Sequence, residues 1–131
     1  MLLMPMRATG VTPDEIHHLT ISEQRELTPR EYLYANAGDD AETLDRLITC
    51  ESGWKMIPNS TGASTAFGYA QFLDSTWRST RKRMGLDQTL GSRENPTEHI
   101  DALIFLWDEG RGSAHWNESK FCWQRTLSVP R

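Results

Sequence analysis

Residues 41–54 read AETLDRLITCESGW, and this stretch decides the fold. Leu44, Leu47 and Ile48 lie three and four residues apart, which places their side chains on one face of an α-helix. Gly53 readily adopts the left-handed backbone conformation that commonly ends a helix. The stretch therefore predicts an amphipathic helix that ends at this glycine and buries one apolar face.

Similar signals elsewhere predict further helices. Thr-Pro with a glutamate two residues after the proline, at residues 12–15 and again at 28–31, is typical of a helix start. Aspartate opens a predicted helix over residues 74–84, and an Asn-Pro pair opens another over residues 95–107. Residues 116–123 predict a last short helix. The fold class expected from these patterns is mainly α.

Residues 54–74 differ from the rest of the chain, because Pro, Asn, Gly, Ser and Thr are frequent there and favour turns. We expect a loop-rich or short β insert at this place, within a single helical domain that spans residues 41–124. Residues 1–40 are expected to form a helical extension that packs on this domain, and residues 125–131 a tail.

The composition limits the class of protein. The chain has 131 residues, enough for one domain with a real core. Its formal net charge of -4 argues against binding nucleic acid, which requires a basic surface. No apolar run approaches the roughly 20 residues that span a bilayer, and the opening MLLMPM is too short for a secretory signal. We expect no nucleic-acid partner, no membrane span and no visible signal peptide.

Cys50 and Cys122 lie far apart in the sequence. Two cysteines are too few for a structural zinc site, and the four histidines are not spaced to complete one. The pair is either two buried thiols or one disulfide that closes a loop of about 70 residues, worth a few kcal/mol. A disulfide would imply oxidising surroundings and would fix the end of the first helix described above. We expect no metal and no cofactor.

Four ordered blocks carry more specific information. They are CESGW at residues 50–54, NSTG at 59–62, AFGYAQF at 66–72 and TW at 76–77. This order resembles the soluble lytic transglycosylase (SLT) domain of the lysozyme-like superfamily and the related resuscitation-promoting-factor domain. In those families a Glu-Ser pair ends a helix and a Gly-x-x-Gln segment follows. The resemblance covers about residues 41–124, although the Ala-Tyr-Asn block of many members is absent, and it implies a lysozyme-like domain that cleaves peptidoglycan glycan strands.

The resemblance implies Glu51 as the single catalytic acid. Such an acid must stay protonated near neutral pH to protonate a leaving oxygen. Burial against apolar groups and the negative end of a helix dipole both raise the pKa of a carboxyl group. The residues that match the family's sugar cleft, or lie beside those that match, are Ser52, Asn59, Phe67, Tyr69 and Gln71.

The absence of a marked second acid favours one reaction. A hydrolase usually needs a second carboxylate, and the candidates Asp74, Asp101 and Asp108 do not lie at positions that the resemblance marks. In a lytic transglycosylase the MurNAc-GlcNAc bond is cleaved, the substrate's own hydroxyl attacks the anomeric carbon, and a 1,6-anhydro-muramoyl product is left. The alternatives are a hydrolytic muramidase of the same fold and a non-catalytic cell-wall-binding module.

We expect the protein to bind the glycan strands of peptidoglycan and to be a monomer. The expected location is outside the cytoplasm, in the periplasm, the cell wall or a phage virion.

Overall fold

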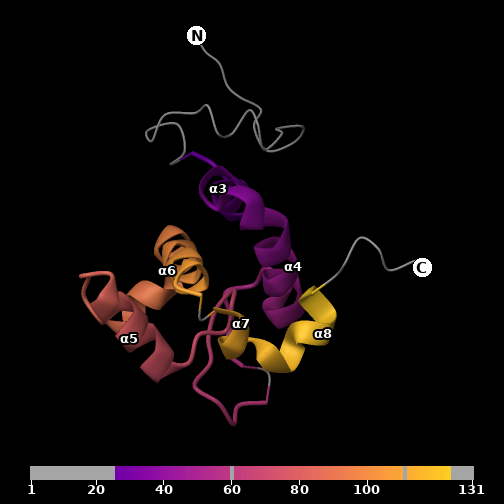
Figure 1. Ribbon diagram of the computed structural model, residues 1–131. Helices are drawn as coiled ribbons and strands as arrows, with labels where there is room; N and C mark the ends of the chain where they lie inside the picture. The colour runs from indigo at the N-terminus through magenta and orange to yellow at the C-terminus, as the bar shows by residue number, and fades with distance from the viewer. Residues whose placement is uncertain (1–25, 60, 111, 125–131) are drawn as a thin grey trace.

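The structure, a computed structural model, describes residues 26–59, 61–110 and 112–124 (Figure 1). It is mainly helical, which confirms the fold class expected from the sequence. The α-helices are α3 Pro29–Asn36, α4 Ala41–Ser52, α5 Asp74–Arg83, α6 Pro96–Asp108, α7 Gly112–His115 and α8 Lys120–Trp123. The short 3-10 helices are η1 Gly38–Asp40, η2 Leu90–Glu94 and η3 Asn117–Ser119. The helix start predicted at residues 12–15 and the tail 125–131 lie outside the described residues.

α4 forms where the sequence predicts it. The side chains of Leu44, Leu47 and Ile48 are fully buried. Gly53 ends the helix with a φ of 66°, and its N–H donates to two carbonyl oxygens of the last turn. This left-handed residue turns the chain away from the helix axis, and it leaves Glu51 in the final turn of α4.

Two other helix starts follow the predicted capping chemistry. Before α3, Thr28 Oγ1 accepts a hydrogen bond from the Glu31 N–H, and Glu31 Oε1 accepts one from the Thr28 N–H. Before α6, Asn95 Oδ1 accepts a hydrogen bond from the Glu98 N–H at 3.1 Å. In each case a proline occupies the first helical turn, where its missing N–H leaves no hydrogen bond unmade.

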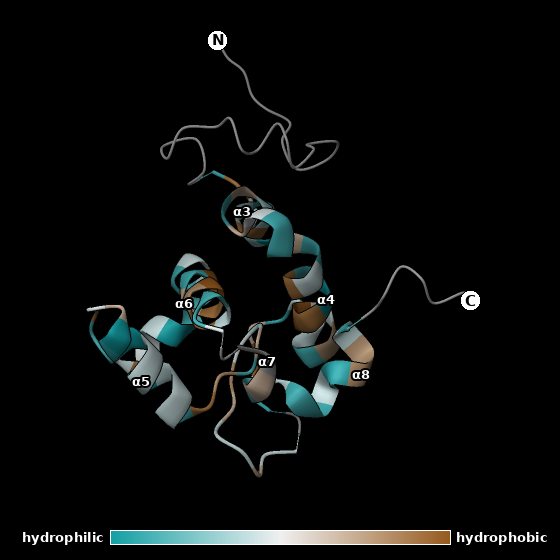
Figure 2. Ribbon diagram, in the orientation of Figure 1, coloured by the Kyte–Doolittle hydropathy of each residue, from teal (hydrophilic) through white to brown (hydrophobic). Residues whose placement is uncertain are grey.

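The core lies between α6 and the helices around it. Ile100, Leu103 and Leu106 of α6 are fully buried and join Leu33 of α3, Trp77 of α5 and the apolar face of α4 in one cluster. In Figure 2 hydrophobic residues concentrate on parts of α4 and α6, whereas α5 is mostly hydrophilic.

Among the described residues no helix is both long and apolar enough to cross a membrane.

The helix predicted over residues 116–123 is broken, and this prediction is corrected. The stretch begins with a non-helical residue, Trp116, at φ −113° and ψ 27°. Its indole Nε1 donates to the Ala70 carbonyl oxygen at 2.6 Å, so the ring is drawn into the core rather than along a helix surface. η3 and α8 then divide the remainder of the segment.

The segment between α4 and α5 is a loop, held by two isolated β-bridges that Phe67 makes with Pro58 and Phe72. The loop-rich or short β insert expected around residues 54–74 is present in this form. Gly68 has a φ of 90°, and an added Cβ would collide with the His99 ring. The loop therefore depends on a glycine at this close approach to α6.

His99 connects this loop to α6. Its ring is fully buried, with Nε2 accepting the Ala70 N–H at 3.0 Å and Nδ1 lying 2.9 Å from the Arg93 carbonyl oxygen. This arrangement uses a neutral imidazole that carries its proton on Nδ1. Burial lowers the pKa of His99 from 6.5 to about 4.

Acidification is expected to weaken the fold through His99. Between pH 6.5 and 4 the unfolded chain binds a proton at His99 that the folded chain does not. The contribution of His99 to the free energy of unfolding therefore falls as the pH falls, by up to about 3 kcal/mol. Urea unfolding at several pH values measures the slope. In His99→Gln the free energy of unfolding should lose this part of its pH dependence, whereas His115→Gln, at an exposed histidine, should keep it. Equal pH dependence in the wild type and His99→Gln would contradict the prediction.

Cys50 and Cys122 form a disulfide, which decides between the two states that the sequence left open. Their Cα atoms are 6.2 Å apart, and they lie 72 residues apart in the chain. The bond joins the last turn of α4 to α8, so two segments that are distant in sequence are covalently fixed side by side (Figure 1).

Removing this disulfide with Cys50→Ser and Cys122→Ser together is expected to lower the free energy of unfolding by about 4 kcal/mol, because the unfolded chain regains the freedom of a long loop. Equilibrium unfolding in urea measures the loss. The wild type in a strong reductant should match the double variant. Equal stability of the oxidised protein and the double variant would contradict the prediction.

Candidate active site

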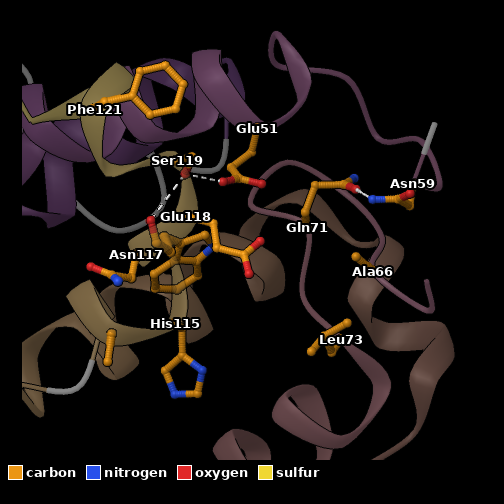
Figure 3. A pocket seen from close by; sticks show the side chains of 12 residues that line it. Glu51, Asn59, Ala66, Gln71, Leu73, His115, Asn117, Glu118, Ser119 and Phe121 are labelled. Carbon is orange, nitrogen blue, oxygen red and sulfur yellow. Dashed lines mark hydrogen bonds between the residues drawn. The ribbon is translucent and has the colours of Figure 1, made fainter. Parts of the chain in front are cut away.

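Glu51 faces an open cleft of ≈ 600 Å³ (Figure 3). The cleft lies between the end of α4, the loop before α5, and the segment that runs from α7 to α8. The residues that line it are Glu51, Asn59, Ala66, Gln71, Leu73, Ala114, His115, Trp116, Asn117, Glu118, Ser119 and Phe121. The predicted acid is therefore accessible to a ligand, and two of the five predicted substrate contacts, Asn59 and Gln71, lie in the same cleft.

The surroundings of Glu51 favour its protonated form. Partial burial raises the pKa of its carboxyl group, the hydrogen bond from the Ser119 hydroxyl lowers it, and the negative charge of Glu118 raises it, with a raised pKa as the net result. The position in the last turn of α4 adds the negative end of a helix dipole. Glu51 thus has the environment of a group that keeps its proton above the usual carboxyl range.

Gln71 presents a hydrogen-bond acceptor to the cleft. Its backbone has a φ of 57°, which is uncommon for a residue with a side chain. Its amide nitrogen donates to the carbonyl oxygens of Ile57 and Gly68 at 3.0 and 2.9 Å. Its Oε1 accepts only a long 3.5 Å bond from Asn59 Nδ2 within the described chain. Because both amide protons are used, the oxygen is left as the group that a ligand can reach.

Ser52 lies next to Glu51 in sequence but outside the lining of the cleft. Its hydroxyl donates to the Tyr69 carbonyl oxygen at 2.8 Å and accepts the Lys55 N–H at 3.2 Å. In this structure the hydroxyl links the end of α4 to the following loop.

Tyr69 and Phe67 also lie outside the cleft lining. The Tyr69 ring is buried between Trp54 and His99, with ring centroids 5.1 and 5.6 Å away. The Phe67 ring lies under the Arg93 guanidinium at 5.3 Å. Tyr69 packs the loop against the core, whereas Phe67 is half-buried beside Arg93. The apolar part of the cleft wall comes instead from alanine, leucine, tryptophan and phenylalanine at other positions.

The C-terminal segment supplies site residues that the sequence did not reveal. Ser119, Glu118 and Phe121 line the cleft, and Phe121 is 88% exposed there. The signal that could have located them is the cysteine pair, because Cys122 follows Ser119 by three residues and bonds to the neighbour of Glu51. That signal requires the disulfide to be known.

The carboxylates considered for a second acid lie elsewhere. Asp74 forms an ion pair with Arg93 at 2.9 Å, and Asp101 accepts a hydrogen bond from the Tyr32 hydroxyl at 2.7 Å. Neither these residues nor Asp108 line the cleft. Glu118 does, at an exposed position on η3.

No protein-family model, curated protein or solved structure matches this chain. Within the described residues, no three His, Cys, Asp or Glu side chains lie close enough together to hold a metal ion.

Glu118→Gln is expected to lower the pKa of Glu51, because the neutral amide removes a negative charge that disfavours the Glu51 anion. NMR titration of the 13C-labelled Glu51 carboxyl group, assigned with Glu51→Gln, measures the change. Glu94→Gln, at an exposed position of η2 outside the cleft lining, is the matched control and should leave the pKa as in the wild type. An unchanged or higher pKa in Glu118→Gln would contradict this description of the cleft.

Proposed function

We propose that this protein is a peptidoglycan lytic transglycosylase with a lysozyme-like domain. One observation carries the proposal: the sequence block that resembles the family's catalytic motif places Glu51, a carboxyl group with a raised pKa, in an open cleft. A buried acid without access to a ligand could not act on a polymer, and an exposed acid would be ionised at neutral pH. Glu51 combines access with partial burial.

The proposed reaction needs one acid. Glu51 gives its proton to the oxygen of the MurNAc-GlcNAc bond, and the bond between that oxygen and the MurNAc anomeric carbon breaks. The hydroxyl on C6 of the same MurNAc then attacks the anomeric carbon and closes the 1,6-anhydro ring. Its proton passes to the Glu51 carboxylate, which restores the acid without consuming water.

The cleft offers groups that suit a glycan. Gln71 Oε1 can accept from a sugar hydroxyl or an N-acetyl N–H, and the side-chain amides of Asn59 and Asn117 line the same space. The exposed Phe121 ring provides a flat apolar surface of the kind on which sugar rings stack. Together these groups fit a neutral, amide-bearing polysaccharide.

Glu118 favours a second candidate, a hydrolytic muramidase. Its carboxylate lines the cleft with Glu51 and is exposed, so it could activate a water molecule as general base. The third alternative, a non-catalytic cell-wall-binding module, has no use for an acid with a raised pKa in the cleft.

The proposal includes a place of action outside the cytoplasm, in the periplasm, cell wall or a virion. The disulfide supports it, because such bonds persist in oxidising surroundings. The proposal also includes action as a monomer.

Mass spectrometry of muropeptides released from purified peptidoglycan tests the proposal. The expected products carry 1,6-anhydro ends, lighter by one water than hydrolysis products, and Glu51→Gln should release none. Products with reducing ends, lost in Glu118→Gln, would establish the muramidase instead. No release by the folded wild type would leave the binding module.

Phe121→Ala is expected to weaken the binding of soluble peptidoglycan fragments roughly 2- to 10-fold, the value of one aromatic stacking contact. The stability of the fold should hardly change, because the ring is 88% exposed. Calorimetric titration on the Glu51→Gln background measures affinity without turnover. Leu86→Ala, at a 46% exposed apolar residue outside the cleft lining, is the control. Equal losses in both variants would contradict a specific role for Phe121.

A further inference from the structure

The two oxygens of the Glu51 carboxyl group have different surroundings. Ser119 Oγ donates a hydrogen bond to Glu51 Oε2, and the two oxygens are 2.5 Å apart. Oε1 receives no hydrogen bond from the part of the chain that the structure describes. Figure 3 shows Ser119 on one side of the carboxyl group, with Gln71 across the open space on the other. The group is held at one oxygen and free at the other.

Trp123 directs the Ser119 hydroxyl. The indole is almost fully buried, and its Nε1 donates to both Ser119 Oγ and the Trp116 carbonyl oxygen, each at 3.1 Å. An oxygen that accepts this bond turns its own proton elsewhere. Two acceptors are in reach, Glu51 Oε2 at 2.5 Å and the Trp116 carbonyl oxygen at 3.2 Å, and the shorter bond to an ionisable group is the stronger one.

The disulfide fixes both ends of this contact. Glu51 follows Cys50 directly, and Ser119 lies three residues before Cys122. A serine on an untethered C-terminal segment would lose conformational freedom to make the bond, whereas here the covalent link has already removed much of that freedom. The contact is therefore built into the fold.

We propose that Ser119 is a positioning residue for Glu51: it occupies Oε2, so that the acid proton is carried on Oε1 towards the cleft, and it stabilises the carboxylate left after that proton is donated. The catalytic part of this inference rests on the proposed function. The hydrogen bond and its effect on ionisation exist without substrate.

The effect on ionisation has a definite sign. A hydroxyl that donates to a carboxylate favours the ionised form, so Ser119 lowers the pKa of Glu51 against the opposing effects of burial and of Glu118. The other titratable groups near this end of the cleft are His115 on α7, which lines it, and Lys120, which opens α8. None of these is removed when Ser119 alone is changed.

Ser119→Ala is the decisive variant. Titration of the 13C-labelled Glu51 carboxyl group without substrate is expected to give a higher pKa than in the wild type, and Ser119→Thr, which keeps the hydroxyl, should restore it. Trp123→Phe keeps an aromatic ring but removes the N–H, and its Glu51 pKa should move in the same direction as in Ser119→Ala. Trp123→Phe is therefore a second variant that tests the effect on the Glu51 pKa while Ser119 itself is unchanged.

Ser92→Ala is the matched control. Ser92 also donates to a carbonyl oxygen three residues earlier, that of Thr89 at 2.7 Å, but it lies outside the cleft lining. If Ser119 only stabilised its own turn, Ser119→Ala and Ser92→Ala would behave alike and the pKa of Glu51 would stay unchanged in both. That result would overturn the inference.

Turnover separates this inference from the proposed function. If the protein releases muropeptides, Ser119→Ala should lower kcat more than it changes KM, and the alkaline limb of its pH profile should move to higher pH. A shifted pKa with no turnover in any variant would remove the proposed function and keep the role of Ser119 in ionisation. Turnover with an unshifted Glu51 pKa and an unshifted pH profile in Ser119→Ala would keep the proposed function and overturn the role of Ser119.

Discussion

The disulfide between Cys50 and Cys122 is the constraint on which the candidate site depends. It joins the last turn of α4 to α8, and the residues on either side of it are those that meet in the cleft. Glu51 follows one cysteine directly, and Ser119 and Phe121 lie close before the other. Without this bond, the short α8 would have to hold its place through the packing of Trp123 and a few hydrogen bonds, against the conformational entropy of an untethered segment.

A site of this kind balances burial against access. The core helices hold the end of α4 in place, and Gly53 turns the chain so that Glu51 lies at the edge of the core. The loop before α5 forms the opposite wall, and its backbone is fixed by His99 and by an uncommon positive φ at Gln71. Such backbone conformations cost free energy and persist where the surrounding contacts impose them. Polar and apolar side chains line the resulting cleft on both sides, with Asn59 and Gln71 on the loop side and the exposed Phe121 ring on the other.

The sequence predicted the helices up to α6 and two of the residues that line the candidate cleft. Periodicity and capping predicted α3 to α6 because those signals are local, and the block order placed Glu51 and Gln71 in what proved to be one cleft. Ser52 and Tyr69 belong to the same blocks, but their side-chain directions depend on hydrogen bonds and packing between distant segments, which spacing does not encode. Ser119 was missed for the same reason, since its contact with the acid spans 68 residues and depends on the disulfide.

The central claim is that the cleft beside Glu51 binds glycan. The most direct test is an NMR titration of the Glu51→Gln variant with a soluble peptidoglycan fragment, following the backbone and side-chain amides. The account predicts shifts concentrated on the residues that line the cleft, with the side-chain amide of Gln71 and the backbone of Phe121 among them. Shifts confined to another face, such as the basic end of α5, or no shifts at saturating fragment, would contradict it.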